Sequence, residues 1–181
     1  MEENQPPYTT PERRAIHEAG HVVLHRCFGD PAKIESADIK RSEERDAYGQ
    51  VVVPTCSPSA LEAVSLMVST LGGLAAEHIQ YCDRDYRGGD GDIREAEGIY
   101  HQLVDAMGIE PTKESTVKCL NACTAAAIMV LKKRWSCVEK VASALLLKEE
   151  IFRPEIIELT VDCHPREFER HIQNLYNILM S

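Results

Sequence analysis

The sequence predicts a mainly α-helical domain with one small β-hairpin. Apolar residues recur at helical spacing along most of the chain, which indicates amphipathic helices. Two short segments, 33–40 and 47–53, flank a polar turn instead and indicate two paired strands. A hydrophobic content of 44% over 181 residues suits a single globular core.

The first helix is expected over about 9–28. Pro11 suits its first turn, and Gly29 offers a stop signal after its last apolar residue. Gly20 lies inside this helix, where glycine costs roughly 1 kcal/mol relative to alanine. Its presence therefore predicts that another element packs closely against the helix at this point.

The segments after the hairpin are expected to be helical. One helix follows Ser57-Pro58 and runs to about residue 81, with Gly72 and Gly73 in its middle, where small residues allow close backbone packing. The others are expected at about 92–107, at 112–149 as one helix or as two with a break near Trp135, after Pro154, and at 165–180.

Charge and composition narrow the class of protein. The net charge of −9 argues against nucleic acid or an anionic membrane as the main partner. No apolar run approaches the roughly 20 residues of a membrane span, and the polar N-terminus does not resemble a signal peptide. The seven cysteines are odd in number and include no C-x-x-C pair, so reduced thiols and a cytoplasmic location are expected.

The most informative motif is the run His-Glu-Ala-Gly-His at 17–21. On a helix, His17 and His21 lie one turn apart on nearly the same face, a spacing at which two imidazoles can bind one zinc ion. Glu18 lies between them, close enough to handle a proton of a metal-bound water, as in the H-E-x-x-H motif of zinc peptidases. His25 is excluded as a third ligand because it lies about 12 Å along the helix axis from His17.

The third ligand is expected from the glycine-rich segment RGGDGD at 87–92. Asp92 opens the next helix, and Asp90 is the alternative candidate. An aspartate at a helix start is also a common cap or dipole partner, so the residues alone leave this choice open.

Five segments, in order, together resemble the zinc peptidase domain of FtsH-type membrane proteases. They are HEAGH at 17–21, AYGQV at 47–51, LGGLAAE at 71–77, GGDGDI at 88–93 and VASALLLKEEIFRPEIIEL at 141–159. The chain departs from the family pattern at Leu74, where the family usually has arginine. The resemblance implies a helical zincin-like peptidase domain at 9–160, after a flexible N-terminus at 1–8. An amphipathic C-terminal helix at 161–181 then packs on the domain or at a subunit contact.

The resemblance implies a zinc-dependent metalloendopeptidase that hydrolyses unfolded or flexible polypeptides. His17, His21 and Asp92 are then the ligands of one Zn²⁺ per chain, and Glu18 is the catalytic carboxylate. Glu77 matches a family carboxylate whose default role is a structural hydrogen bond, with support of the zinc site as the lesser alternative.

The second strand offers a substrate-binding hypothesis. Gly49, Gln50 and Val51 lie in it and could hold an extended peptide by edge pairing, which recognises backbone more than side chains.

The expected partners follow from what the family has and this sequence lacks. No G-x-x-x-x-G-K-[ST] motif occurs, so we expect no ATP hydrolysis by this chain and a separate ATPase wherever folded substrates must be unfolded. The resemblance implies a homo-oligomer, a hexamer as in relatives, with a dimer as the alternative. Two other classes stay open: a zinc-binding regulatory or interaction module with little proteolytic activity, and a helical interaction protein without metal.

Overall fold

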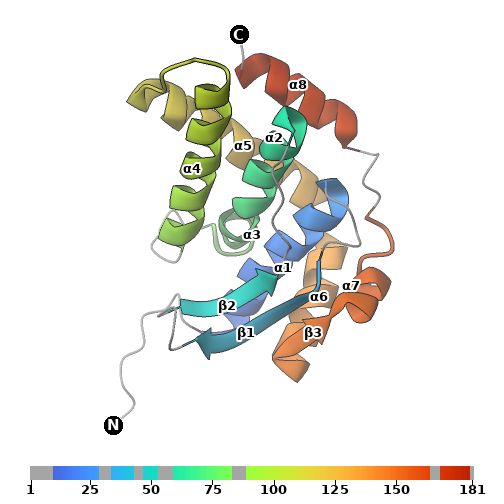
Figure 1. Cartoon of the computed structure of the whole chain (residues 1–181). Coiled ribbons are helices and arrows are strands. Elements are labelled where there is room, and N and C mark those ends of the chain that lie inside the picture. The colour runs from blue at the N-terminus through green and yellow to red at the C-terminus, as the bar shows by residue number, and fades with distance from the viewer. Residues whose placement is uncertain are drawn as a thin grey trace.

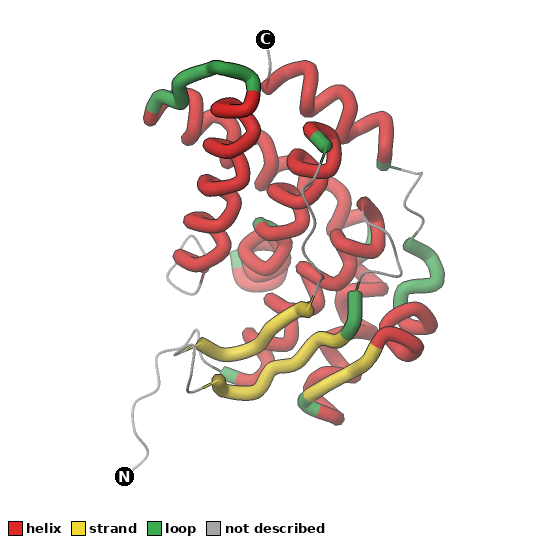
Figure 2. The backbone as a smooth tube through the Cα atoms, viewed as in Figure 1, coloured by secondary structure: helices red, strands yellow, loops and turns green. Residues whose placement is uncertain are grey.

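The computed structural model describes residues 10–28, 34–42, 47–52, 59–82, 89–163 and 168–179. Within these ranges the fold is mainly helical with one small antiparallel sheet, which confirms the predicted class (Figures 1 and 2). The elements are, in order, α1 (Pro11–Phe28), β1 (Ser36–Ser42), β2 (Ala47–Val52), α2 (Ala60–Thr70), α3 (Gly72–Tyr81), α4 (Asp90–Ala106), α5 (Lys113–Lys133), α6 (Trp135–Lys148), β3 (Glu150–Phe152), α7 (Arg153–Leu159) and α8 (Glu169–Leu179).

The sheet contains the predicted hairpin and one strand that the sequence did not predict. Its order is β2-β1-β3, with β1 antiparallel to both neighbours. The third strand covers only Glu150–Phe152, just before the short helix that we expected to start at Pro154. Three residues are too few to show strand periodicity, and they form a strand because they pair with Ser36–Asp38, far away in the sequence.

Two long helical segments are each divided. The segment expected to run to residue 81 as one helix is broken at Leu71 into α2 and α3. Ser59 caps α2, because its hydroxyl accepts from the amide of Glu62 while that side chain accepts from the amide of Ser59. The proposed start at Ser57-Pro58 lies outside the described residues. The second break, between α5 and α6, falls at Arg134, next to the predicted position of Trp135.

Helix α1 is the central element of the fold. It contacts α2, α3, α5 and α6 and both strands of the hairpin. In Figure 1 the sheet lies at one end of the helical body, with α4 and α8 toward the other end. The core-facing side of α1 is fully buried at Ala15, Ala19, Val22, Val23 and Leu24. A helix enclosed in this way can present fixed side chains to several neighbours at once.

Glycines bring α1 and α3 into backbone contact, as the sequence predicted for this part of the chain. A Cβ atom added to Gly20 would lie 2.3 Å from the carbonyl oxygen of Gly72, and one added to Gly72 would lie 2.8 Å from the carbonyl oxygen of Gly20. Backbone atoms cannot move aside as side chains can. The two glycines therefore set the distance between the helices.

The C-terminal helix α8 contacts α2 and α5, with Ile172 and Leu175 buried against them. Residues 1–8 lie outside the described ranges. One helical stretch, Ala60–Tyr81, is long and apolar enough to cross a membrane, but 72% of its most apolar window is buried inside the fold. Core helices of this composition pass the same test, so the stretch is no sign of a membrane span by itself.

We expect Gly20→Ala to destabilise the protein by about 1–3 kcal/mol, because the added methyl group overpacks a backbone contact. Urea unfolding monitored by circular dichroism would measure the change. Gly98→Ala is the matched control: its Cβ would meet nothing within 4 Å, and it should be neutral or stabilise α4 by up to about 1 kcal/mol. Equal stabilities of the parent and Gly20→Ala would contradict the proposed role of this contact.

Candidate metal centre

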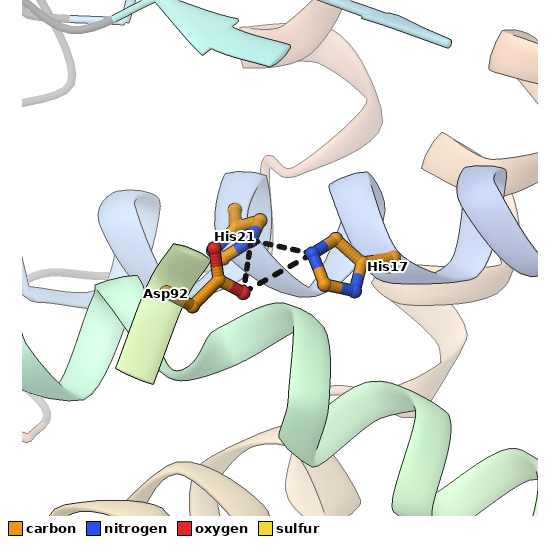
Figure 3. A group of neighbouring side chains, drawn as sticks. All are labelled: His17, His21 and Asp92. Atoms are coloured by element: carbon orange, nitrogen blue, oxygen red, sulfur yellow. Dashed lines mark hydrogen bonds and ion pairs between the residues drawn. The ribbon is translucent and has the colours of Figure 1, made fainter. Parts of the chain in front are cut away.

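Two histidines of α1 form one side of the candidate centre. His17 and His21 lie one turn apart, and their Nε2 atoms are 3.1 Å from each other (Figure 3). Their rings meet edge to face, with centroids 4.8 Å apart. The i, i+4 spacing of the motif thus directs one nitrogen of each ring to a common point.

The third member comes from the first turn of α4. Asp92 places its Oδ2 atom 3.2 Å from Nε2 of His17 and 3.3 Å from Nε2 of His21. The three ligand atoms therefore form a nearly equilateral triangle, visible in Figure 3. The Asp92 oxygen is buried and has no hydrogen-bond partner in the described part of the chain. A buried carboxylate oxygen in this state indicates that a further group belongs there.

The outer nitrogens of both rings are held by other elements. Nδ1 of His21 donates to the main-chain carbonyl of Ser69 over 2.9 Å. That carbonyl lies in the last turn of α2, directly before the break at Leu71. Nδ1 of His17 lies 2.7 Å from Oε1 of Glu77 on α3 and donates to it.

The hydrogen bonds at the two Nδ1 atoms determine which nitrogen of each ring carries the proton. A carbonyl or carboxylate oxygen can only accept, so Nδ1 carries the proton in each ring and the neutral ring presents a lone pair at Nε2. Two lone pairs and a carboxylate oxygen then face one another at 3.1–3.3 Å. Their mutual repulsion is relieved by a metal ion between them or by a proton on one of the rings. His17, His21 and Asp92 are thus positioned to bind a metal ion.

The pKa shifts of His17 and Asp92 also indicate that a positive charge is favoured between these groups. Although burial disfavours an imidazolium, the carboxylates of Asp92 and Glu77 raise the pKa of His17 well above its usual value. Burial likewise disfavours the ionised form of Asp92, but the imidazoles of His21 and His17 lower the pKa of its carboxyl. A metal ion and protons would therefore compete for the same three atoms.

Glu18 lies between the two histidines on α1 and is 5% exposed. Burial raises the pKa of Glu18 to about 7, and the neighbouring imidazoles of His17 and His21 oppose this shift. A buried carboxyl with a pKa near neutrality beside a cation site is suited to proton transfer.

Close packing limits how the ligands can move. A Cβ atom on Gly73 would lie 2.4 Å from Nε2 of His17, so only glycine lets α3 lie under this ring. A Cβ atom on Gly89 would lie 2.0 Å from Cδ2 of Leu74. Leu74 is 5% exposed and lies against Gly89 at the start of α4.

The other residues singled out from the sequence lie elsewhere. Asp90 is exposed at the first position of α4 and is not one of the three grouped ligands. His25 is partly buried, and burial lowers the pKa of its ring to about 3. Gly49, Gln50 and Val51 lie in β2, a strand that contacts α1.

The described cysteines are free thiols, and Cys56 lies outside the described residues. Cys119 and Cys123 are buried in α5, as expected for small apolar core residues. Arg13 and the carbonyl of Ser69 were not predicted from the sequence. Arg13 is joined to the site through Glu77 on α3 and Ser69 lies on α2, so both connections depend on the tertiary fold.

In searches against models of protein families and against curated proteins, no match to this chain was found.

We expect Asp92→Ala to weaken metal binding by tenfold or far more, since loss of a direct ligand should exceed the 10–100-fold effect typical of residues behind the ligands. Chelator competition with Zn²⁺ would measure the affinity. Asp90→Ala removes a carboxylate from the same helical turn without touching the triangle and should leave the affinity unchanged. The reverse result would assign the third ligand to Asp90.

Proposed function

We propose that this chain is a zinc-dependent metalloendopeptidase that hydrolyses peptide bonds in unfolded or flexible polypeptides. The observation that carries the proposal is a His-His-Asp triangle with a buried glutamate between the two histidines on the same helix. A site that only bound metal would have no use for Glu18. Burying a carboxyl group is unfavourable, which favours a chemical role for this residue.

The donor set and its dimensions favour zinc. Two atoms bound to one tetrahedral ion at about 2.0–2.1 Å lie about 3.3 Å apart. The three measured separations are 3.1, 3.2 and 3.3 Å. Two imidazoles and one carboxylate are also the ligand types of catalytic zinc in peptidases, where three protein ligands leave one position open.

The chain's own residues supply the proton transfers. When bound, zinc activates a water molecule near neutral pH and polarises the scissile carbonyl group. Glu18 accepts the proton from the attacking water and passes it to the leaving amine. A cation held by His17, His21 and Asp92 would favour the ionised form of Glu18, the form needed to accept a proton. Glu77 and the Ser69 carbonyl keep the two rings oriented during this exchange.

Strand β2 is the proposed substrate platform. In the order β2-β1-β3 it pairs with β1 on one side, and its other side is an edge of the described sheet. The strand also contacts α1, which carries both histidines. An extended peptide that paired with this edge would run alongside the metal-bearing helix. Such pairing demands an unfolded segment, because residues in a folded protein have their backbone groups already bonded.

The proposal has consequences for partners. No P-loop occurs in the sequence, so ATP should not change the cleavage of an unfolded peptide, and a separate ATPase would be needed for folded substrates. We further propose a cytoplasmic location, which the expected reduced cysteines favour. The family resemblance favours self-association into a hexamer, and a dimer is the alternative.

We expect Glu18→Gln to retain zinc and to lose at least about 10²-fold in turnover of a quenched unfolded peptide, because the amide cannot accept the proton. Elemental analysis of each purified protein establishes that metal content is equal. Full turnover by Glu18→Gln would reject the peptidase mechanism. Inactivity of the zinc-loaded parent on such peptides would favour the regulatory module instead.

Proline substitutions test the substrate strand. Adjacent residues of a strand direct their N–H groups to opposite sides, so one of Gln50→Pro and Val51→Pro removes a bond to β1, and the other removes an N–H at the edge. The variant that loses only the N–H at the sheet edge keeps its bond to β1. Its unfolding midpoint should therefore be close to that of Gln50→Ala. It should keep its zinc and lose tenfold or more in kcat/KM. Unchanged kcat/KM in that variant would exclude pairing at this edge.

A further inference from the structure

A buried arginine extends the hydrogen-bond network behind the metal ligands. Arg13 lies on α1 one turn before His17 and is 8% exposed. Its Nε atom donates to Oε2 of Glu77. The other oxygen of that carboxylate, Oε1, lies 2.7 Å from Nδ1 of His17. Glu77 therefore bridges Arg13 and His17, with one oxygen committed to each.

An aromatic ring covers the guanidinium. The Arg13 Cζ atom lies 5.2 Å from the centroid of the Tyr81 ring, within the range of a cation–π contact. Tyr81 is the last residue of α3, one turn beyond Glu77, so α3 holds the arginine at two points. The Tyr81 side is partly open to solvent, while Glu77 is 7% exposed. The arrangement thus connects the protein surface to a ligand ring through three side chains.

The geometry restricts the position of Glu77 more than a hydrogen bond to His17 alone would do. A carboxylate bonded only to an imidazole can rotate about its side-chain torsions and move the ring with it. A charge-assisted bond from a buried guanidinium fixes the second oxygen and with it the plane of the carboxylate. The direction of the His17 Nε2 lone pair then follows from the position of Arg13.

We propose that Arg13 is a positioning residue for the metal centre, acting on His17 through Glu77 and steadied by Tyr81. This inference rests on the proposed zinc site and adds a residue outside the H-E-x-x-H motif to it. Arg13 is joined to His17 through Glu77, which contacts both residues. Its effect should therefore be on the affinity and geometry of the bound cation, more than on the proton transfer itself.

Cobalt(II) is a suitable probe because it binds zinc sites and its visible absorption reports ligand geometry. The full chain, its Arg13→Gln and Arg13→Lys variants and an exposed control, Arg170→Gln on α8, would be titrated with Co²⁺ in competition with a chelator. We expect Arg13→Gln to weaken Co²⁺ binding by about 10–100-fold and to change the absorption spectrum. Arg13→Lys keeps the charge and should recover part of the affinity, and Arg170→Gln should match the parent.

Tyr81 supplies a second route to the same test should Arg13→Gln fail to fold. Tyr81→Leu removes the ring over the guanidinium, while Tyr81→Phe keeps it. We expect a several-fold loss of Co²⁺ affinity in the leucine variant alone.

The contrary outcomes are distinct. Parent-like Co²⁺ affinity and spectrum in Arg13→Gln, or in Tyr81→Leu where Arg13→Gln does not fold, would overturn the inference and leave the zinc site standing. Failure of the parent itself to bind Co²⁺ or Zn²⁺ would reject the metal centre and the role of Arg13 together.

Discussion

The close crossing of α1 and α3 is the constraint on which the candidate centre depends. Gly20 and Gly72 allow the two backbones to touch, and Gly73 admits the His17 ring over α3. At this separation a side chain as short as glutamate reaches from α3 to the outer nitrogen of His17. A wider crossing would leave His17 without an oriented partner. The orientation of the His17 ring in the site thus depends on the close packing of the two helices.

The electrostatics of the centre follow from that geometry. Partners on α2 and α3 take up the outer nitrogens of both rings, and α4 adds a carboxylate to the inner side. The fold in this way accumulates negative potential at a single point inside a largely apolar body. Such an arrangement is costly in the absence of a compensating positive charge. The raised pKa of His17 is the response of the bare protein, and metal binding is the alternative response.

The parts of the site that local sequence determines could be predicted, and the parts that tertiary contacts determine could not. The i, i+4 spacing of His17 and His21 is a property of one helix, so it is readable without a structure. The break at Leu71 was missed because an apolar helix-forming pattern continues across it. Strand β3 was missed because its pairing partner lies in β1. Arg13 is separated from Glu77 by 64 positions, and nothing near it in the sequence marks it as buried. The residues alone indicated Asp92 or Asp90 as the third ligand, and the resemblance of the flanking segment to a known family favoured Asp92.

The arrangement of the strands bears on what such a centre could act upon. In the described part of the chain, strand β2 lies at the edge of a small sheet and contacts the helix that carries the histidines. A short edge offers backbone hydrogen bonds to a few residues of an extended chain and excludes a compact domain, whose own backbone groups are already paired. A peptidase that bound its substrate through the extended backbone, with few contacts to side chains, would accept many sequences but only unfolded segments. An enzyme of that kind needs an external source of unfolded substrate. That need, more than any motif in this chain, argues for a partner that unfolds proteins.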